Sequence, residues 1–293
     1  MALGEGLSPD LASAGEVAAW QAARRGGNDV VTAGLVERFH ATLGRPILPG
    51  ESGDPAPLGL HWCLAPEAVE ADSLGPDGLP ADGGIIPPIR ILTGIMWGGG
   101  EIAFQQPLRV GDPVERVSRL VGLTEKNGRS GRLVFARLQH EYVVRGQACV
   151  SEVQTIAFRN PVAAPPPPGP DEQAGETWDF SRTVTPTETM LFRFSALTFN
   201  PHRIHYDQPY ATAVEHFPGL VVHGPLTAAL LLDACAGHVG GEAVARFRVK
   251  AERPAYGGNR LTLAGRVAGE EVAMAALDEA GRVVMRGTAT LRR

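Results

Sequence analysis

The chain has 293 residues, of which 44% are hydrophobic, and its formal net charge at pH 7 is −5. This length suits two domains or one domain of double size. The sequence contains no long basic run, so we expect neither nucleic acid nor an anionic membrane as a partner. Its amino terminus lacks the pattern of a secretory signal, and no apolar run could span a bilayer. We therefore expect a cytoplasmic protein.

The cysteine and histidine spacings predict no metal site and no disulfide framework. Cys63, Cys149 and Cys235 are odd in number and far apart in the chain. Cys235 lies in an apolar helical stretch, where a buried and inert thiol is expected. His202 and His205 are three residues apart, but no carboxylate or cysteine set completes a metal site with them.

The first predicted helices occupy residues 9–25 and a segment that starts soon after residue 29. Asp29 or Thr32 can cap the second of them, because short polar side chains accept hydrogen bonds from first-turn N–H groups. Its apolar face would comprise Leu35, Val36, Phe39 and Leu43, and Gly44 and Pro46 would end it.

Residues 46–88 are rich in glycine and proline, which predicts loops. The apolar segment IIPPIRILTGIMWGG follows, and its Trp97 stands beside Gly98–Gly100. We expect these glycines to let the backbone approach a ligand closely. Strands are then predicted at 101–107, 113–126, 132–144 and 149–159, with turns at 110–112, 127–131 and 145–147.

Residues 160–177 (NPVAAPPPPGPDEQAGET) combine a proline run with small and acidic residues. Such a segment is stiff, solvated and unable to form a packed core, so we interpret it as a linker. It separates an amino-terminal domain at 1–159 from a carboxy-terminal domain at 178–293.

The second domain has its predicted elements in the same broad order as the first. A strand is predicted at 185–195, followed by a histidine-rich loop and a helix at 225–239. That helix is apolar almost all round, so other elements have to enclose it. Further strands are predicted at 245–252, 260–268, 271–278 and 283–291.

An antiparallel sheet wrapped around one buried helix is the hotdog architecture. Two copies of this order of elements predict a double hotdog of the α+β class, with two antiparallel sheets that each wrap a buried helix. The amino-terminal hotdog would be the degenerate half that shapes the substrate pocket. The carboxy-terminal hotdog would carry the catalytic loop.

The stretch from 193 to 228 contains four of the eight histidines and is the richest in chemistry. His205 is the natural general base, because an unperturbed imidazole titrates at about pH 6.5. Asn200 and Thr198 can hold a water molecule as donor and acceptor without titrating. Gly224 opens the buried helix, whose free N–H groups can receive a negatively charged oxygen.

Two parts of the chain resemble one family. The first is SALTFNPHRIHYD followed by PGLVVHGPL, and the second is IIPP…MWGGGEIAFQQPLRVGD with its TEKNGRSGRLVF turn. They resemble the hydroxyacyl-thioester dehydratase type 2 branch of the MaoC-like hydratases, over the chain from about Asp29 to the end. The resemblance implies a hydro-lyase that adds or removes water across the double bond of an enoyl-CoA thioester. Coenzyme A enters as part of the substrate, and no cofactor is expected.

MaoC-type hydratases usually carry an Asp-x-Asn-Pro-small-His pattern, whose Asp and His form an acid–base dyad around a water molecule. In this chain Asn200 and Pro201 match the Asn-Pro step and His205 matches the histidine, but Thr198 stands at the aspartate position. A threonine hydroxyl cannot carry a proton near neutral pH. One histidine would then take the proton of water and return it to Cα, which gives addition on one face.

Several neighbouring residues keep two interpretations. His223 either binds substrate or packs behind the helix as a core histidine, and Trp97 is either ordinary core or a wall of the acyl pocket. His202 and Arg203 either contact substrate or face solvent. Asp207 is expected to cap a short helix rather than to act as an acid.

The substrate and the overall class also keep alternatives. The resemblance favours a short branched dicarboxylic acyl-CoA such as mesaconyl-C4-CoA or itaconyl-CoA, with an (R)-3-hydroxyacyl-thioester dehydratase of fatty-acid type as the alternative. A hotdog thioesterase would need a carboxylate such as Asp233 or Glu215, and the missing aspartate also allows a non-catalytic acyl-thioester-binding module. Monomer and homodimer are both compatible with the pattern. Candidate anchors for the coenzyme A phosphates are Arg90, Arg129, Arg132, Arg193, Arg203 and Arg248.

Overall fold

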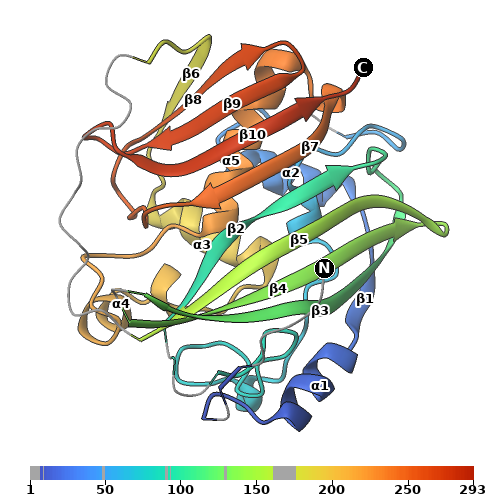
Figure 1. Ribbon diagram of the computed structural model, residues 1–293. Helices are drawn as coiled ribbons and strands as arrows, with labels where there is room; N and C mark the ends of the chain where they lie inside the picture. The colour runs from blue at the N-terminus through green and yellow to red at the C-terminus, as the bar shows by residue number, and fades with distance from the viewer. Residues whose placement is uncertain are drawn as a thin grey trace.

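The computed structural model describes residues 7–8, 10–47, 50–89, 92, 94–128, 131–160 and 176–293. Its strands form one ten-stranded sheet in the order β1-β3-β4-β5-β2-β7-β10-β9-β8-β6. Every neighbouring pair is antiparallel. Most of the helices lie behind this sheet in the view of Figure 1.

The sheet consists of two halves with the same topology. The order β1-β3-β4-β5-β2 in the first half corresponds to β6-β8-β9-β10-β7 in the second. This repeat confirms the predicted fold class, although the two sheets join edge to edge into one. The strands are β1 Arg25–Val30, β2 Gly94–Phe104, β3 Pro113–Gly128, β4 Gly131–Val144, β5 Gln147–Arg159, β6 Phe180–Val184, β7 Val244–Ala251, β8 Leu261–Ala268, β9 Glu271–Leu277 and β10 Val283–Leu291.

The predicted boundary between the two domains falls within residues 160–177. Residues 161–175 of this segment lie outside the described part of the chain, so the linker stays a prediction. The same holds for two of the candidate phosphate anchors, Arg90 and Arg129.

The helix α5 (Gly224–Val239) is the buried helix that the sequence predicts at 225–239. It packs against β2, β7, β8, β9 and β10. Eight of its residues are buried, among them Cys235, which confirms the prediction of a buried thiol. The remaining helices are α1 Ala14–Ala22, α2 Ala33–Thr42, α3 Glu188–Thr198 and α4 Gln208–Ala213, with short 3₁₀ turns η1 Leu60–Cys63, η2 Ala71–Ser73, η3 Arg203–His205 and η4 Gly241–Ala243.

In the amino-terminal half, the prediction of a buried helix inside the sheet is wrong for the described residues. The turn η1 is fully buried there, with the Trp62 indole donating to Glu152 on β5. Gly59 precedes the turn at φ +89°, a backbone conformation that favours glycine. The region 46–88 is too rich in glycine and proline to support a long helix, so a single 3₁₀ turn fills the place.

The cap of α2 is Thr32 rather than Asp29. The Thr32 side chain accepts a hydrogen bond from the N–H of Leu35. The Asp29 carboxylate accepts instead from the N–H groups of Val30 and Ala65. Asp29 lies on β1, a strand that the sequence did not predict.

The strand predicted at 185–195 is wrong, because this segment forms α3. Thr187 caps the helix by accepting from the N–H of Met190. Leu191, Phe194 and Ser195 are its buried residues, at the i, i+3 and i+4 spacing of a helix face. The cap and this spacing outweigh the strand propensity of the threonines in the segment.

We call the antiparallel pairing of β2 with β7 the seam, because it joins the two halves of the sheet (Figure 1). At Gly99 (φ +124°) a Cβ atom would lie 2.2 Å from the carbonyl oxygen of Val249. A register shift in the pairing of β2 with β5 falls between Trp97 and Gly99. The prediction that these glycines admit a ligand is therefore wrong for Gly99, which admits the neighbouring strand instead.

None of the helices in the described part of the chain is long and apolar enough to cross a membrane.

Because the backbones approach closely at the seam, we expect Gly99→Ala to lower the free energy of unfolding strongly. The new methyl group would collide with the Val249 carbonyl and also occupy a positive φ, so we expect the free energy of unfolding to fall by at least about 3 kcal/mol. Gly146→Ala is the matched control, because Gly146 has φ +82° but no atom within 4 Å of a Cβ. It should cost about 1–2 kcal/mol. Urea denaturation measures both values, and equal losses would contradict the steric role of Gly99.

Candidate active site

His205 is held as a neutral imidazole with one nitrogen free. Its Nδ1–H donates to the carbonyl oxygen of Val221 at 2.7 Å, which leaves the lone pair on Nε2. The side chain is only 7% exposed. Burial, helped by nearby His202, lowers the pKa of His205 to about 3. The group is therefore unprotonated throughout the neutral range, which is the form that a general base needs.

His223 lies face to face with His205. The two ring centroids are 3.6 Å apart and the planes differ by 20°. Nε2 of His223 is hydrogen-bonded to the Ser195 hydroxyl at 2.8 Å, and its Nδ1 is buried without a partner among the described residues. Burial lowers the pKa of His223 well below its usual value. His223 is thus a hydrogen-bonded core residue, and its contact with substrate stays a prediction.

His202 is the third imidazole of this cluster. Its ring meets that of His205 edge-on, with centroids 5.5 Å apart. The side chain is 8% exposed, so the interpretation of His202 as a solvent-facing residue is wrong. Burial lowers the pKa of His202 to about 4.

Asn200 and Thr198 flank the cluster and shape its loop. The Asn200 side-chain oxygen accepts from the N–H of His202, which leaves the amide nitrogen able to donate. Thr198 ends α3, and its hydroxyl donates to the carbonyl of Phe194 at 2.7 Å. That contact uses the only proton of the Thr198 hydroxyl, so this side chain can still accept a hydrogen bond from a water molecule.

Backbone pairing fixes the segment that faces His205. The N–H of Val221 donates to the Ile204 carbonyl, and the N–H of Val222 donates to Ala255. Val221 also forms an isolated bridge with Tyr256. One short stretch therefore supplies the carbonyl that sets the His205 tautomer, the stacking ring of His223 and the start of α5.

Gly224 places the amino terminus of α5 against the amino-terminal half of the protein. A Cβ on Gly224 would lie 2.5 Å from the Trp97 ring, so only glycine fits this contact. The prediction that Trp97 is brought across from the first half agrees with this contact. The indole nitrogen of Trp97 is buried and has no hydrogen-bond partner in the part of the chain that the structure describes. The first-turn N–H groups of α5 start here, and a helix amino terminus carries partial positive charge.

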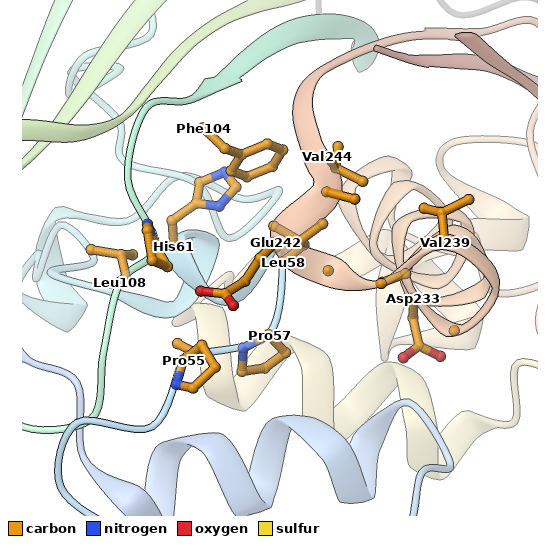
Figure 2. A pocket seen from close by; sticks show the side chains of 18 of the residues that line it. Pro55, Pro57, Leu58, His61, Phe104, Leu108, Asp233, Val239, Glu242 and Val244 are labelled. Atoms are coloured by element: carbon orange, nitrogen blue, oxygen red, sulfur yellow. The ribbon is translucent and has the colours of Figure 1, made fainter. Parts of the chain in front are cut away.

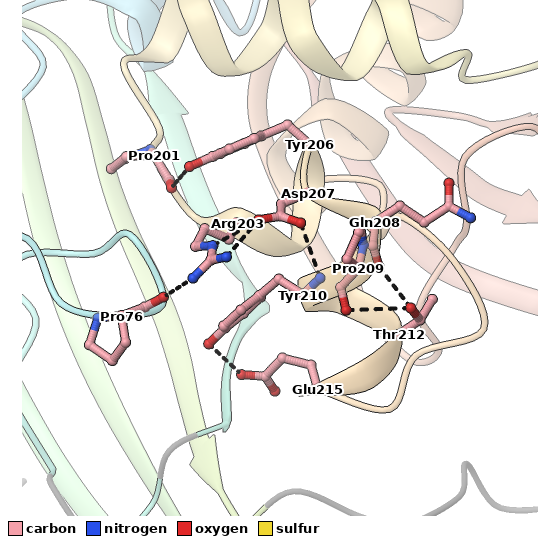
Figure 3. Close-up of polar contacts among 10 residues, drawn as sticks. All are labelled: Pro76, Pro201, Arg203, Tyr206, Asp207, Gln208, Pro209, Tyr210, Thr212 and Glu215. Carbon is pink, nitrogen blue, oxygen red and sulfur yellow. Dashed lines mark hydrogen bonds and ion pairs between the residues drawn. The ribbon is translucent and has the colours of Figure 1, made fainter.

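The Arg203 side chain already makes hydrogen bonds and a ring contact within the protein. Its guanidinium donates to the Asp207 carboxylate and to the Pro76 carbonyl, and it lies 4.3 Å from the centre of the Tyr210 ring (Figure 3). Asp207 also caps α4 through the N–H of Tyr210, as the sequence predicts. A contact of Arg203 with substrate stays a prediction, and its present bonds brace the loop.

Sequence reasoning missed two residues that support the site. Ser195 binds His223, but it lies in the segment that was predicted as a strand. Gly78 packs on the histidine loop, and a Cβ there would lie 2.1 Å from the Pro201 carbonyl. Its φ of +88° is the signal that only the structure reveals, because the sequence around it reads as an ordinary loop.

The two carboxylates considered for a thioesterase are bonded to other side chains of the protein. Asp233 on α5 forms ion pairs with Arg45 and Arg182. Glu215 is bonded to the Tyr210 hydroxyl at 3.3 Å, and burial raises the pKa of its carboxyl. No contact joins either of them to His205 among the described residues.

A neutral imidazole beside a helix amino terminus, inside a double hotdog, can move a proton next to an oxygen that gains negative charge, as a hydro-lyase requires. A cavity of about 700 Å³ lies elsewhere, and no residue of the histidine cluster lines it. We assign the candidate catalytic site to the histidine loop because the unprotonated His205 ring and the helix terminus meet there.

The chain belongs to the hydroxyacyl-thioester dehydratase type 2 family, whose model matches residues 59–257. It is 37% identical over 251 residues to a mesaconyl-C(4)-CoA hydratase of Chloroflexus aurantiacus, a match that covers 86% of this chain and 89% of the relative.

Solved structures agree on the fold. A MaoC-like dehydratase superposes with a TM-score of 0.71 and 14% identity, covering 92% of this chain and 97% of the other. A Mycobacterium tuberculosis protein described as a double hotdog superposes with a TM-score of 0.55 and 14% identity, covering 91% and 94%. At these identities the likeness concerns architecture alone.

The buried histidines predict a loss of stability in mild acid. In the unfolded chain each imidazole gains a proton below about pH 6.5, whereas the folded pKa is about 4 for His202 and about 3 for His205. Their contribution to the free energy of unfolding is complete at a pH above the pKa of the unfolded state. It is lost as the pH falls towards the pKa values of the folded state. We expect the free energy of unfolding to drop by about 1.4 kcal/mol per pH unit for each such histidine between pH 6 and 5.

Urea denaturation at pH 7, 6 and 5 measures this slope. His202→Gln should reduce the slope of the free energy of unfolding against pH by about the contribution of one histidine. His216→Gln is the control, because His216 is exposed. An unchanged slope in His202→Gln would show that His202 does not stay neutral in the folded protein.

Proposed function

We propose that the chain hydrates an enoyl-CoA thioester, or dehydrates the corresponding hydroxyacyl-CoA, with mesaconyl-C4-CoA or itaconyl-CoA as the best specific substrate. The observation that carries this proposal is the 37% identity to a mesaconyl-C(4)-CoA hydratase across 86% of the chain. The geometry at His205 supports it, because hydration requires a base, a proton for Cα and a site for enolate charge.

In the proposed step, Nε2 of His205 takes a proton from water while the hydroxyl oxygen bonds to the β-carbon. The double-bond electrons move towards the thioester, and negative charge collects on its carbonyl oxygen. The Val221 carbonyl stabilises the imidazolium that forms, because it keeps accepting from Nδ1–H. His205 then returns the proton to Cα, and the enolate collapses to the hydroxyacyl thioester.

The enolate oxygen would be received by N–H groups in the first turn of α5. Gly224 brings that turn within contact of Trp97, so the indole would form a wall beside the thioester. Pro225 removes an N–H from this turn but supplies the φ that the helix needs. N–H groups aimed at a developing oxyanion are among the largest single contributions to catalysis, at about 10²–10³-fold for each.

Asn200 and Thr198 are proposed to hold the attacking water. The Asn200 amide nitrogen can donate and the Thr198 oxygen can accept, because their other groups are already bonded to the chain. Neither group titrates near neutral pH, so proton transfer falls to His205 alone. Addition of hydroxyl and hydrogen to the same face follows, since one base serves both steps.

An (R)-3-hydroxyacyl-thioester dehydratase of fatty-acid type is the second candidate, and the name of the family favours it. A thioesterase finds less support, because Asp233 is committed to two arginines.

Among the proposed phosphate anchors, Arg132 and Arg248 are paired with acidic residues, while Arg193 is exposed. A cytoplasmic location, the absence of a cofactor and a monomeric or homodimeric state remain part of the proposal.

His205→Asn tests the proposed base. The Asn amide can still donate to Val221 in place of Nδ1, but it offers no basic nitrogen at the position of Nε2. We expect kcat/KM to fall by about 10²–10⁴-fold. Purified protein is incubated with mesaconyl-C4-CoA, itaconyl-CoA and crotonyl-CoA, and the conjugated double bond and free thiol are both followed.

The control for this substitution is His216→Gln, in an exposed position of the same stretch. Activity of His205→Asn within about threefold of the unaltered protein, under ~1 kcal/mol in barrier, would remove His205 as the base. Thiol release without loss of the double bond would replace the hydratase by a thioesterase.

Gly224→Ala tests the helix terminus. The new methyl group would collide with the Trp97 ring, so either the ring or the first turn of α5 has to move. We expect a loss of about 10²-fold in kcat/KM, because a shift of about 1 Å in a positioning group has that cost. Adding Trp97→Leu should recover part of the loss. Gly15→Ala on the exposed face of α1 is the control, and a double variant no better than Gly224→Ala would contradict the contact.

A further inference from the structure

Four buried side-chain nitrogens have no hydrogen-bond partner among the described residues. Such atoms are rare in proteins, and a bound molecule is one way to complete their bonding. Two of them, in His40 and His61, border the cavity of about 700 Å³ in Figure 2, away from the histidine loop. The other two are Nε1 of Trp97 and Nδ1 of His223. Of these four side chains, that of His223 stacks on the ring of His205, the proposed base.

The His223 ring carries one proton. The residue is only 1% exposed, and burial lowers the pKa of His223 well below its usual value. A neutral imidazole has one N–H group that donates and one nitrogen that accepts. The partner of one ring nitrogen decides which of the two holds the proton.

The Ser195 hydroxyl is that partner. Its oxygen lies 2.8 Å from Nε2 of His223, and the hydroxyl makes no other hydrogen bond among the described residues. A ring proton on Nε2 would leave both the Ser195 proton and the lone pair of Nδ1 unpaired. A hydroxyl that donates to Nε2 leaves only one group unpaired, the N–H at Nδ1. Because each unpaired buried polar group costs free energy, the second arrangement is favoured.

Nδ1 of His223 lies close to the start of α5. In an imidazole this nitrogen is bonded to the ring carbon that carries Cβ, so it stays near the backbone of its own residue. That backbone is the N-cap of α5, directly before Gly224, and the His223 side chain makes no capping bond there. The free donor therefore adjoins the first-turn N–H groups that are proposed to receive the enolate oxygen.

The stacked rings of His205 and His223 offer complementary groups. Their centroids are 3.6 Å apart and their planes differ by 20°. His205 has a free lone pair on Nε2, because its Nδ1–H donates to Val221. His223 adds a free N–H from the neighbouring ring. Hydration needs both kinds of group at once, an acceptor for the proton of water and a donor for the thioester oxygen.

We propose that the Nδ1–H of His223 donates a hydrogen bond to the thioester oxygen of the substrate, and that Ser195 is the positioning residue that keeps the ring proton on Nδ1. This contact rests on the proposed function, because the oxygen belongs to the enoyl-CoA substrate. His223 transfers no proton, and its hydrogen bond strengthens as negative charge collects on the oxygen. His205 remains the group that moves the proton.

His223→Gln and His223→Asn separate the free donor from the bond to Ser195. The Gln amide reaches the position of Nε2 and can bond to Ser195, but it leaves no donor at the position of Nδ1. The shorter Asn amide can place its N–H₂ group near Nδ1 and does not reach Ser195. We expect kcat to fall by about 10²–10³-fold in His223→Gln, and by at least about tenfold less in His223→Asn.

The assay uses the enoyl-CoA that the unaltered protein hydrates fastest, with His216→Gln at an exposed position as the control. A purely structural role of His223 predicts the opposite order, because the bond to Ser195 would then be the one that matters. Equal losses in the two variants, or a larger loss in His223→Asn, would overturn the donor role.

Butyryl-CoA and S-butyl-CoA read the oxygen contact without the reaction. They differ in the carbonyl oxygen, which only the thioester has, and neither has a double bond to hydrate. Titration calorimetry gives the two dissociation constants, and we expect the unaltered protein to prefer the thioester. His223→Gln should lose about fivefold of this preference, which corresponds to one net hydrogen bond.

These two analogues also separate the contact from the proposed function. A preference that is lost in His223→Gln, in a protein that hydrates none of the enoyl-CoAs, would contradict the hydratase and leave the contact standing. Equal binding of the two analogues by the unaltered protein, no binding of either, or an unchanged preference in His223→Gln would overturn the contact.

Ser195→Ala tests the positioning role and leaves the His223 ring in place. Without the hydroxyl the ring proton is shared between both nitrogens, so we expect kcat to fall by about fivefold. Ser195→Thr keeps a hydroxyl and should recover most of this loss, whereas a packing defect would not be rescued. Ser181→Ala, at an exposed position, is the control, and urea denaturation verifies that each variant is folded. Unchanged kcat in Ser195→Ala would overturn the role of Ser195.

Discussion

The pairing of β2 with β7 is the constraint on which the rest of the molecule depends. It joins two five-stranded halves into one sheet, and Gly99 is what lets their backbones come close enough. The register of the same pairing fixes which residues of β2 lie next to the second half. Trp97, two residues before Gly99, is thereby placed against the start of α5. A residue of one half therefore helps to shape a candidate site whose proposed base belongs to the other, which explains why neither half would form that site alone.

Those parts of the fold that depend on local chemistry could be predicted from the sequence. Thr32 as a cap and the enclosed helix α5 follow from hydrogen bonding and periodicity within a few residues. The strand predicted at 185–195 failed because a cap at Thr187 and a narrow apolar face decide in favour of α3. The helix expected inside the first half failed for another reason. Its place is filled by η1, whose burial depends on distant partners such as Glu152.

In the candidate site, too, some residues can be predicted from the local sequence and others depend on contacts between distant parts of the chain. The sequence points to His205 and to the terminus at Gly224, because a motif and a glycine-led helix are visible in it. Ser195 and Gly78 could not be identified, since each acts through a partner far away in the chain. The burial that keeps the three imidazoles of the cluster neutral also comes from tertiary packing. His205 is therefore unprotonated at neutral pH although Thr198 stands where a carboxylate is expected.

The carboxylate–imidazole pair that the histidine loop lacks occurs at the far end of the seam. There His61 faces Glu152 in the buried interior of the first half. A buried carboxylate is expensive unless it is paired, and Trp62 and His61 supply that pairing. At the loop the protein uses the opposite solution, in which a backbone carbonyl orients His205 and no buried charge has to be compensated. Because both halves share one topology, the two ends of the seam are the same architectural position built with different electrostatics.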